Sequence, residues 1–270
     1  MRTAWRQLEK ELGQVDAILF LLDARIPRTS RHHTLEAALK KRDIPLVYVL
    51  HKSDLADHNA TQQWVRELSR DAIAMPLSSG GQNSKMDKGL LQCLSELQHK
   101  VSARWLARGL QERALKVRLV GLPNVGKSSL LNRLAGRGAA KTGKKPGLTR
   151  GQTQWIQASE NLMVLDSPGI LYPRLENWDE VARLAACGCI RKEVLPMIEV
   201  AQNLLAQMVE LGVSHCLPSQ GEVTLENLAS RLGFKLKGGD LDLERAAAWL
   251  LQSCFDGKLG KITWERACDE

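Results

Sequence analysis

The sequence lacks any long hydrophobic run. No window of its 270 residues approaches the roughly 18 uncharged apolar residues of a membrane-spanning helix, so we expect no membrane span. The N-terminus also lacks the apolar stretch of a secretion signal, because it leads directly into a charged helical pattern. These absences favour the cytoplasm. An organellar matrix, reached with a transit peptide that has since been removed, is the less favoured location.

Cysteine pairs with metal-ligand spacing are missing as well. None of the six cysteines forms a C-x-x-C pair, and Cys187 and Cys189 have no pair of histidines nearby. Zinc sites typically use such pairs, so we expect no zinc site and interpret the cysteines as small core residues.

Acidic residues are absent from one long segment. Residues 113–159 contain ten Lys or Arg and no Asp or Glu, in a chain whose formal net charge is +8. A local positive field attracts phosphate, either of a nucleotide or of a nucleic-acid backbone. Residues 176–270 carry a net charge of −5, so the charge indicates phosphate contact near 113–159 rather than at a basic tail.

Apolar runs alternate with helical patterns over the first part of the chain, which is typical of a doubly wound α/β sheet. We predict strands at residues 15–23, 44–50, 73–77, 115–120, 155–156 and 162–165. We predict helices at residues 3–14, 30–42, 61–70, 85–106 and from 128 to at least 135. Later windows are only helical, at residues 176–186, 191–212, 224–233 and 240–255. We therefore expect an α/β domain with a mostly parallel sheet over 1–175 and a small all-helical domain over 176–270.

A phosphate-binding loop is predicted at residues 121–128. They read G-L-P-N-V-G-K-S, which matches G-x-x-x-x-G-K-[ST], and they join a predicted strand to a predicted helix. In this motif backbone N–H groups surround the phosphates, Lys127 reaches the β- and γ-phosphates, and Ser128 ligates Mg²⁺. The predicted nucleotide-binding residues here are Asn124, Val125, Gly126, Lys127, Ser128 and Ser129.

Such a loop needs a second carboxylate at the end of a neighbouring strand. Residues 166–169 read D-S-P-G after an apolar strand, so Asp166 would hold the Mg²⁺ water shell and the Gly169 N–H would bind the γ-phosphate. In the basic loop 144–151, we predict that Thr149 closes on Mg²⁺ when the γ-phosphate is present. We assign the catalytic roles to Lys127, Thr149 and Gly169.

Base recognition is predicted upstream. Residues 51–54, H-K-S-D, follow an apolar strand and resemble the guanine motif N-K-x-D, with His where Asn is usual. Asp54 would accept hydrogen bonds from the ring N1–H and the exocyclic amine, and Lys52 would lie over the ring and ribose. Residues 78–80, S-S-G, resemble the S-A-K loop that backs the base. The predicted guanine-binding residues are His51, Lys52, Asp54, Ser78 and Ser79.

The order of these motifs is unusual. In an ordinary GTPase the base motifs follow the phosphate loop, whereas here they precede it, which is a circular permutation of a kind that neighbouring termini permit. With this order, the sequence resembles the circularly permuted GTPases of the YlqF type, most closely the ribosome biogenesis GTPase A family. The resemblance covers residues 1 to about 200 well and the rest more loosely. It is carried by residues 23–27, 30–31, 123–128, 140–143, 146–147 and 166–171.

The resemblance implies a Rossmann-like P-loop GTPase domain and a helical domain that binds rRNA. It implies binding of GTP and GDP, and slow hydrolysis of GTP that the large ribosomal subunit stimulates during its late assembly. The expected partners are therefore this subunit and its rRNA, and no binding of DNA is expected. We expect the protein to be a monomer and to lie in the bacterial cytoplasm. The residue after D-x-x-G is Ile170, where Ras-like enzymes have Gln, so slow intrinsic turnover is expected.

The sequence departs from the family at two places. Family members have a Phe-Pro-Gly-His-Met stretch before the first helix, whose His is thought to help hydrolysis, and Met1 stands where that Met would fall. The other departure is His51, which either weakens guanine affinity or replaces Asn as a hydrogen-bonding group. Two interpretations of Asn124 stay open. In some GTPases an Asn at this position helps to coordinate K⁺ beside the phosphates, and alternatively Asn124 is simply a polar loop residue.

Basic residues surround the predicted switch loop, and two interpretations stay open for them: a solvated face or a surface for rRNA phosphates. They are Arg133, Arg137, Lys141, Lys144, Lys145 and Arg150. Two other functions also stay open, namely a P-loop ATPase and an RNA-binding protein that uses guanine nucleotide as a structural switch.

Overall fold

The computed structural model describes residues 12–80, 87–142, 155–165, 177–191, 195–218 and 221–267, and of residues 137–142 it describes only the backbone. The chain forms two compact units. The first comprises Met1–Leu22, Ser30–Lys52 and Val65–Leu171. The second comprises Asp23–Thr29, Ser53–Trp64 and Tyr172–Glu270.

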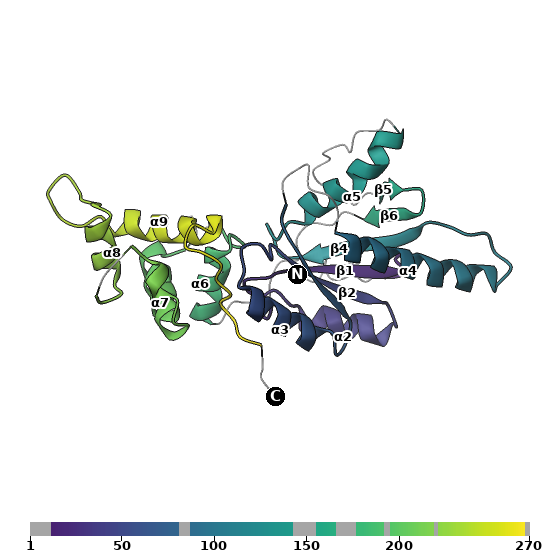
Figure 1. The fold of residues 1–270 in the computed structure, drawn as a ribbon, viewed down its shortest axis with the longest axis horizontal. Helices are drawn as coiled ribbons and strands as arrows, with labels where there is room; N and C mark the ends of the chain where they lie inside the picture. The colour runs from purple at the N-terminus through teal and green to yellow at the C-terminus, as the bar shows by residue number, and fades with distance from the viewer. Residues whose placement is uncertain are drawn as a thin grey trace. The chain divides into compact units, whose positions relative to one another are not determined.

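The first unit is built on a six-stranded sheet in the order β3-β2-β1-β4-β6-β5 (Figure 1). Its strands are β1 (Ala17–Asp23), β2 (Leu46–His51), β3 (Ile73–Leu77), β4 (Leu115–Gly121), β5 (Trp155–Ser159) and β6 (Leu162–Leu165). The pairs β1–β4, β2–β3 and β4–β6 are parallel, and the edge strand β5 runs antiparallel to β6. The predicted α/β class with a mostly parallel sheet is thereby confirmed.

The sheet has its topological switch point between β1 and β4. From β1 the chain moves outward through β2 to β3, whereas β6 and β5 lie on the other side of β4, where the chain runs first to the edge strand β5 and then back to β6. In open α/β sheets ligands bind beyond the carboxyl ends of the strands at such a point. Both strands are central, and all seven residues of β1 are buried, which agrees with the apolar run of its first six residues; the seventh is Asp23.

In the described part of the chain before residue 155, the helices are α2 (His33–Lys41), α3 (His58–Leu68), α4 (Lys88–Leu106) and α5 (Lys127–Thr142). Helix α4 packs against β4, and α5 packs against β4 and β5. The Asp87 carboxylate accepts a hydrogen bond of 3.1 Å from the Leu90 N–H and so caps the start of α4. Across the described parts of the chain, no helix has the length and apolar character needed to cross a membrane.

The C-terminal part of the second unit is helical. It contains α6 (Trp178–Ala186), α7 (Met197–Glu210), the 3₁₀ turn η2 (Ser214–Cys216), α8 (Leu225–Arg231) and α9 (Leu243–Asp256). Helix α7 packs against α6 and α9, and α8 packs against α9. In the part of this region that the structure describes, the only β pairing is an isolated bridge between Lys235 and Leu241. The predicted helical domain is thus confirmed in its fold class.

A buried arginine fixes the loop after β1 within the second unit. Arg25 is 2% exposed, and its Nε and Nη2 donate to the two carboxylate oxygens of Asp23, each at 2.9 Å. Nη1 and Nη2 also donate to the carbonyls of Cys254, Phe255 and Cys187, at the ends of α9 and α6. Burial opposes the charge, but the Cys187 thiol and the Asp23 carboxylate outweigh it and raise the pKa of Arg25 above its ordinary value. A cation is favourable at helix C-termini, so Arg25 stabilises the ends of two helices at once.

Candidate nucleotide-binding site

The predicted phosphate loop joins β4 to α5 at the switch point of the sheet. Gly121 closes β4 with a φ of 153°, and a Cβ there would overlap with the carbonyl oxygen of Leu21 on β1. The backbone then turns through positive φ at Asn124 (56°) and Gly126 (107°). Glycine at 121 and 126 therefore permits two backbone approaches that a side chain would prevent.

His51 lies directly against this loop. It ends β2 and is 1% exposed. A Cβ built on Gly126 would stand only 2.5 Å from Nδ1 of the His51 ring, so the imidazole fills the space beside the loop. The residue that departs from the usual N-K-x-D motif is thus in contact with the phosphate loop.

Lys127 holds its charge inside the loop. The side chain is 8% exposed, and Nζ donates to the carbonyl oxygens of Gly121 at 3.0 Å and Leu122 at 2.6 Å. Lys127 is also the first residue of α5, where the helix dipole is positive. An ammonium group and a helix N-terminus at one loop form a site for an anion such as phosphate.

The neighbouring positions of the loop differ in exposure. Val125 is fully buried and anchors the loop, whereas Asn124, Ser128 and Ser129 are exposed. Ser128 stands in the first turn of α5, so its hydroxyl fits the Mg²⁺ role that the motif predicts.

The loop after β3 is tied to α5. Nη1 of Arg133 donates to the carbonyl oxygens of Ser78 at 2.9 Å and Ser79 at 3.4 Å. Arg133 is one of the basic residues that surround the predicted switch loop in the sequence, and in the structure its guanidinium donates to the predicted base-backing loop. No sequence pattern could have revealed this contact, because the acceptors are backbone carbonyls.

The two remaining base-motif residues follow β2. Lys52 has a positive φ of 59°, so the chain turns immediately after the strand. Asp54 is half-buried and belongs to the segment Ser53–Trp64 of the second unit. The structure thus places Lys52 and Asp54 at the carboxyl end of β2, as the sequence predicts.

Several predicted residues lie outside the described ranges. These are Thr149, Asp166 and Gly169 of the site, Ile170, the basic residues Lys144, Lys145 and Arg150, and the side chains of Arg137 and Lys141. Across the described ranges, no group of three or more His, Cys, Asp or Glu could hold a metal ion. Of the predicted Mg²⁺ ligands, the structure therefore places Ser128 alone.

Comparison with known proteins connects this site to a family. A family model described as "50S ribosome-binding GTPase" matches residues 116–223, which begin in β4 and include the phosphate loop. The chain is 33% identical to the ribosome biogenesis GTPase A of Priestia megaterium, over 98% of this chain and 94% of that protein. It is 30% identical to the protein of the same name from Bacillus licheniformis, over 100% of this chain and 96% of that one.

Among solved structures, the chain is similar to GNP-bound YlqF from T. maritima. The TM-score is 0.71 at 24% sequence identity, and the likeness covers 98% of each chain. At this identity the likeness concerns the fold, and it extends over both the sheet and the helical region.

Proposed function

This chain belongs to the ribosome biogenesis GTPase A family, and we propose that it assists assembly of the large ribosomal subunit, which stimulates its slow hydrolysis of GTP. As a member of this family it is a GTPase with a role in ribosome biogenesis.

One observation carries the proposal most strongly. The phosphate loop lies at the switch point between β1 and β4, and the base motif at the end of β2 precedes it in the chain. This is the sheet of a P-loop GTPase entered at a different strand, and only a permuted GTPase needs both motifs in this order. The ammonium of Lys127 and the start of α5 supply the positive charge that a nucleotide phosphate requires.

We assign the phosphate chemistry to residues of three segments. Lys127 and the loop N–H groups would bind the phosphates, while Ser128, Thr149 and Asp166 would hold Mg²⁺. When bound, this ion neutralises charge on the β- and γ-phosphate oxygens. Gly169 would contact the γ-phosphate through its N–H.

A K⁺ ion beside the phosphates is part of the proposal. Asn124 is exposed and lies on the phosphate loop, where its backbone has a left-handed φ of 56°. A cation there would stabilise developing charge in the transition state. Hydrolysis should therefore be faster in KCl than in NaCl at matched ionic strength, and equal rates would exclude this role.

Guanine selection is assigned to Asp54. A carboxylate accepts from both N1–H and the exocyclic amine, whereas an Asn amide offers one donor and one acceptor. Xanthine has an oxygen in place of that amine, so Asp54→Asn should lower GDP affinity and raise XDP affinity. Competition titrations of GDP, XDP and ADP would measure this. If the Asp54→Asn variant prefers GDP over XDP as strongly as the unsubstituted protein does, the assignment is contradicted. If the unsubstituted protein prefers ADP over GDP, an ATPase is favoured instead.

The large ribosomal subunit and its rRNA are the proposed partners. The description of the matched family model as 50S ribosome-binding supports this choice, and so does the absence of acidic residues from 113–159. We propose that the protein meets this subunit as a monomer in the cytoplasm, with the helical domain as a further rRNA contact. Since that domain is acidic overall, its contact would require a local basic patch.

Co-sedimentation tests this partner. The protein with a non-hydrolysable GTP analogue should pellet with large subunits and not with small ones. Lys144→Ala with Lys145→Ala should weaken that association while GDP affinity is kept, because the removed charges serve rRNA phosphates. Equal pelleting with both subunits would contradict the choice of partner, and unchanged pelleting of the double variant would exclude the role of this loop.

A further inference from the structure

The loop that carries Asp54 is embedded in the second unit. Ser53–Trp64 is part of that unit, and within it Ala56 and Trp64 are fully buried. Residues 257–267, which follow α9 and which we call the strap, make three contacts with this segment. No part of the guanine motif itself suggests such a connection, because the two segments are about 200 residues apart.

The strap contacts Ser53–Trp64 at three points, two in the loop before α3 and one on α3. A Cβ on Gly257 would lie 2.8 Å from Cδ2 of Leu55, so the strap backbone packs closely on the residue next to Asp54. The Asp57 N–H donates to Oγ1 of Thr263 at 3.1 Å. Trp64 Nε1 donates to the carbonyl oxygen of Glu265 at 3.0 Å.

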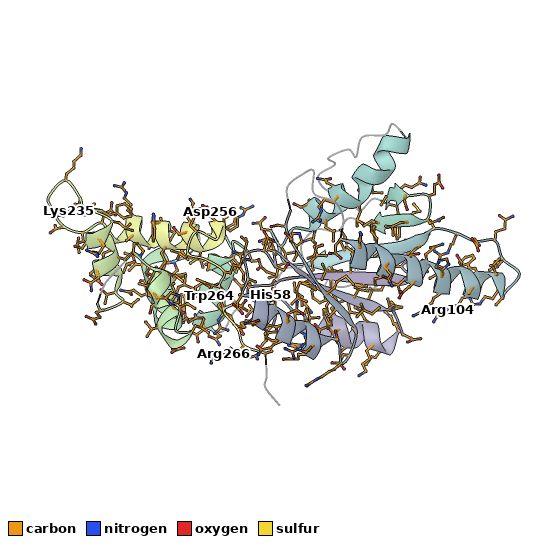
Figure 2. The ribbon with its side chains drawn as sticks, viewed as in Figure 1. His58, Arg104, Lys235, Asp256, Trp264 and Arg266 are labelled. Carbon is orange, nitrogen blue, oxygen red and sulfur yellow. The ribbon has the colours of Figure 1, made fainter. Side chains whose placement is uncertain are left out.

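Figure 2 labels one residue from each side of these contacts, Trp264 of the strap and His58, the first residue of α3. His58 follows the strap-bonded Asp57 in the sequence. The strap therefore holds Ser53–Trp64 at two points in the loop before α3 and at one point on α3 itself.

The strap is itself firmly anchored. The Trp264 N–H donates to the carbonyl oxygen of Arg25 at 2.8 Å, and the Trp264 side chain is only 3% exposed. The Glu265 carboxylate accepts from the N–H groups of Arg28 at 2.6 Å and Thr29 at 3.1 Å. A segment fixed in this way can hold a neighbouring loop in one conformation.

We propose that the strap is a positioning element for base recognition, which fixes the loop so that the Asp54 carboxylate meets the guanine edge. This inference rests on the proposed role of Asp54. The described contacts of the phosphate loop, with His51 and within itself, lie in the first unit. The strap should therefore govern the choice of base rather than the affinity for phosphate.

The ratio of GDP affinity to IDP affinity measures this effect. Hypoxanthine lacks the exocyclic amine, so IDP makes only one of the two hydrogen bonds to the carboxylate, and the ratio reports the second bond. Loss of the protein fold would lower both affinities together and leave the ratio unchanged. The strap variants weaken the contact between the strap and the loop. They are Leu55→Ala on the loop side, Thr263→Val on the strap side, and their combination in the full chain, with Asp54→Ala as the reference.

Thr224→Val is the matched control. Thr224 also lies in the second unit, where its Oγ1 accepts from the Asn227 N–H at 3.2 Å and caps α8. Thr224→Val and Thr263→Val each remove one hydroxyl that accepts a hydrogen bond from a backbone N–H. Only Thr263→Val removes a contact with the loop that carries Asp54.

In the parent protein we expect GDP to bind about tenfold or more tightly than IDP, since the amine bonds a charged carboxylate. The combined strap variant should reduce this ratio at least about threefold, because small displacements weaken a directional bond. Thr224→Val should leave it unchanged. If Asp54→Ala removes the preference and the strap variants keep it in full, the strap has no positioning role. If Asp54→Ala keeps the preference, the proposed base site and this inference both fail.

Discussion

The contact between His51 and Gly126 yields the most specific prediction about the phosphate loop. Gly126→Ala would introduce two faults at once. The backbone at position 126 has a φ of 107°, which L side chains rarely adopt, and the new methyl group would lie 2.5 Å from Nδ1 of His51. The strained backbone costs about 1–3 kcal/mol. Overpacking against a fully buried ring costs about 1–3 kcal/mol more.

A double-mutant cycle separates the two costs. His51→Ala removes the ring, so the combined variant retains the backbone strain and loses the overlap. We expect a coupling of about 1–3 kcal/mol between the two positions, with the combined variant more stable than the sum of the single changes indicates. Urea unfolding would give the free energies of unfolding, and titration with a fluorescent guanine nucleotide would give the affinities.

The expected order is therefore clear. Gly126→Ala should bind nucleotide most weakly, and His51→Ala should recover part of that loss in the combined variant. Strict additivity of the two changes would refute the contact, because independent sites do not couple. Parent-like nucleotide affinity of Gly126→Ala would refute the whole account of the loop.

Three further changes test other parts of the structure. Lys127→Ala should weaken GDP binding about 10- to 150-fold by calorimetry, because a charged hydrogen bond to phosphate is lost; an unchanged affinity would exclude this lysine from the site. Arg25→Met should lower the free energy of unfolding by about 3–5 kcal/mol in urea, because the Asp23 charge would stay buried without its counter-ion; a loss below about 1 kcal/mol would contradict the buried pair. Arg133→Met should weaken GDP binding by less than about tenfold through a loosened Ser78 carbonyl, while co-sedimentation with large subunits is kept. Normal GDP affinity together with lost co-sedimentation would instead support the rRNA-contact interpretation of Arg133.

The sheet could be predicted from sequence because its strands have distinctive patterns. Residues 17–22 of the central strand β1 are an unbroken apolar run, and β3 was predicted with the bounds that the structure gives it. The phosphate loop could be predicted because its glycines answer local backbone needs, which Gly121 and Gly126 illustrate with their positive φ. Such features depend on residues close together in the chain.

The contacts that fix the loops could not be predicted. Arg25 looks like a surface residue in the sequence, yet its acceptors include carbonyls of Cys187 and Cys254, which are 162 and 229 residues away. A pattern read in chain order also cannot show that Ser53–Trp64 belongs to one compact unit with the C-terminal helices. Backbone carbonyls carry no sequence signal, so side chains that bind them are found only in the folded chain.

Single-turnover GTP hydrolysis with purified ribosomal subunits tests the central claim most directly. The protein alone should hydrolyse GTP slowly, large subunits should accelerate hydrolysis, and small subunits should not. Lys127→Ala should abolish the signal under every condition, which excludes a contaminating GTPase. A rate that large subunits leave unchanged, or that both subunits raise equally, would contradict an assembly factor of the large ribosomal subunit.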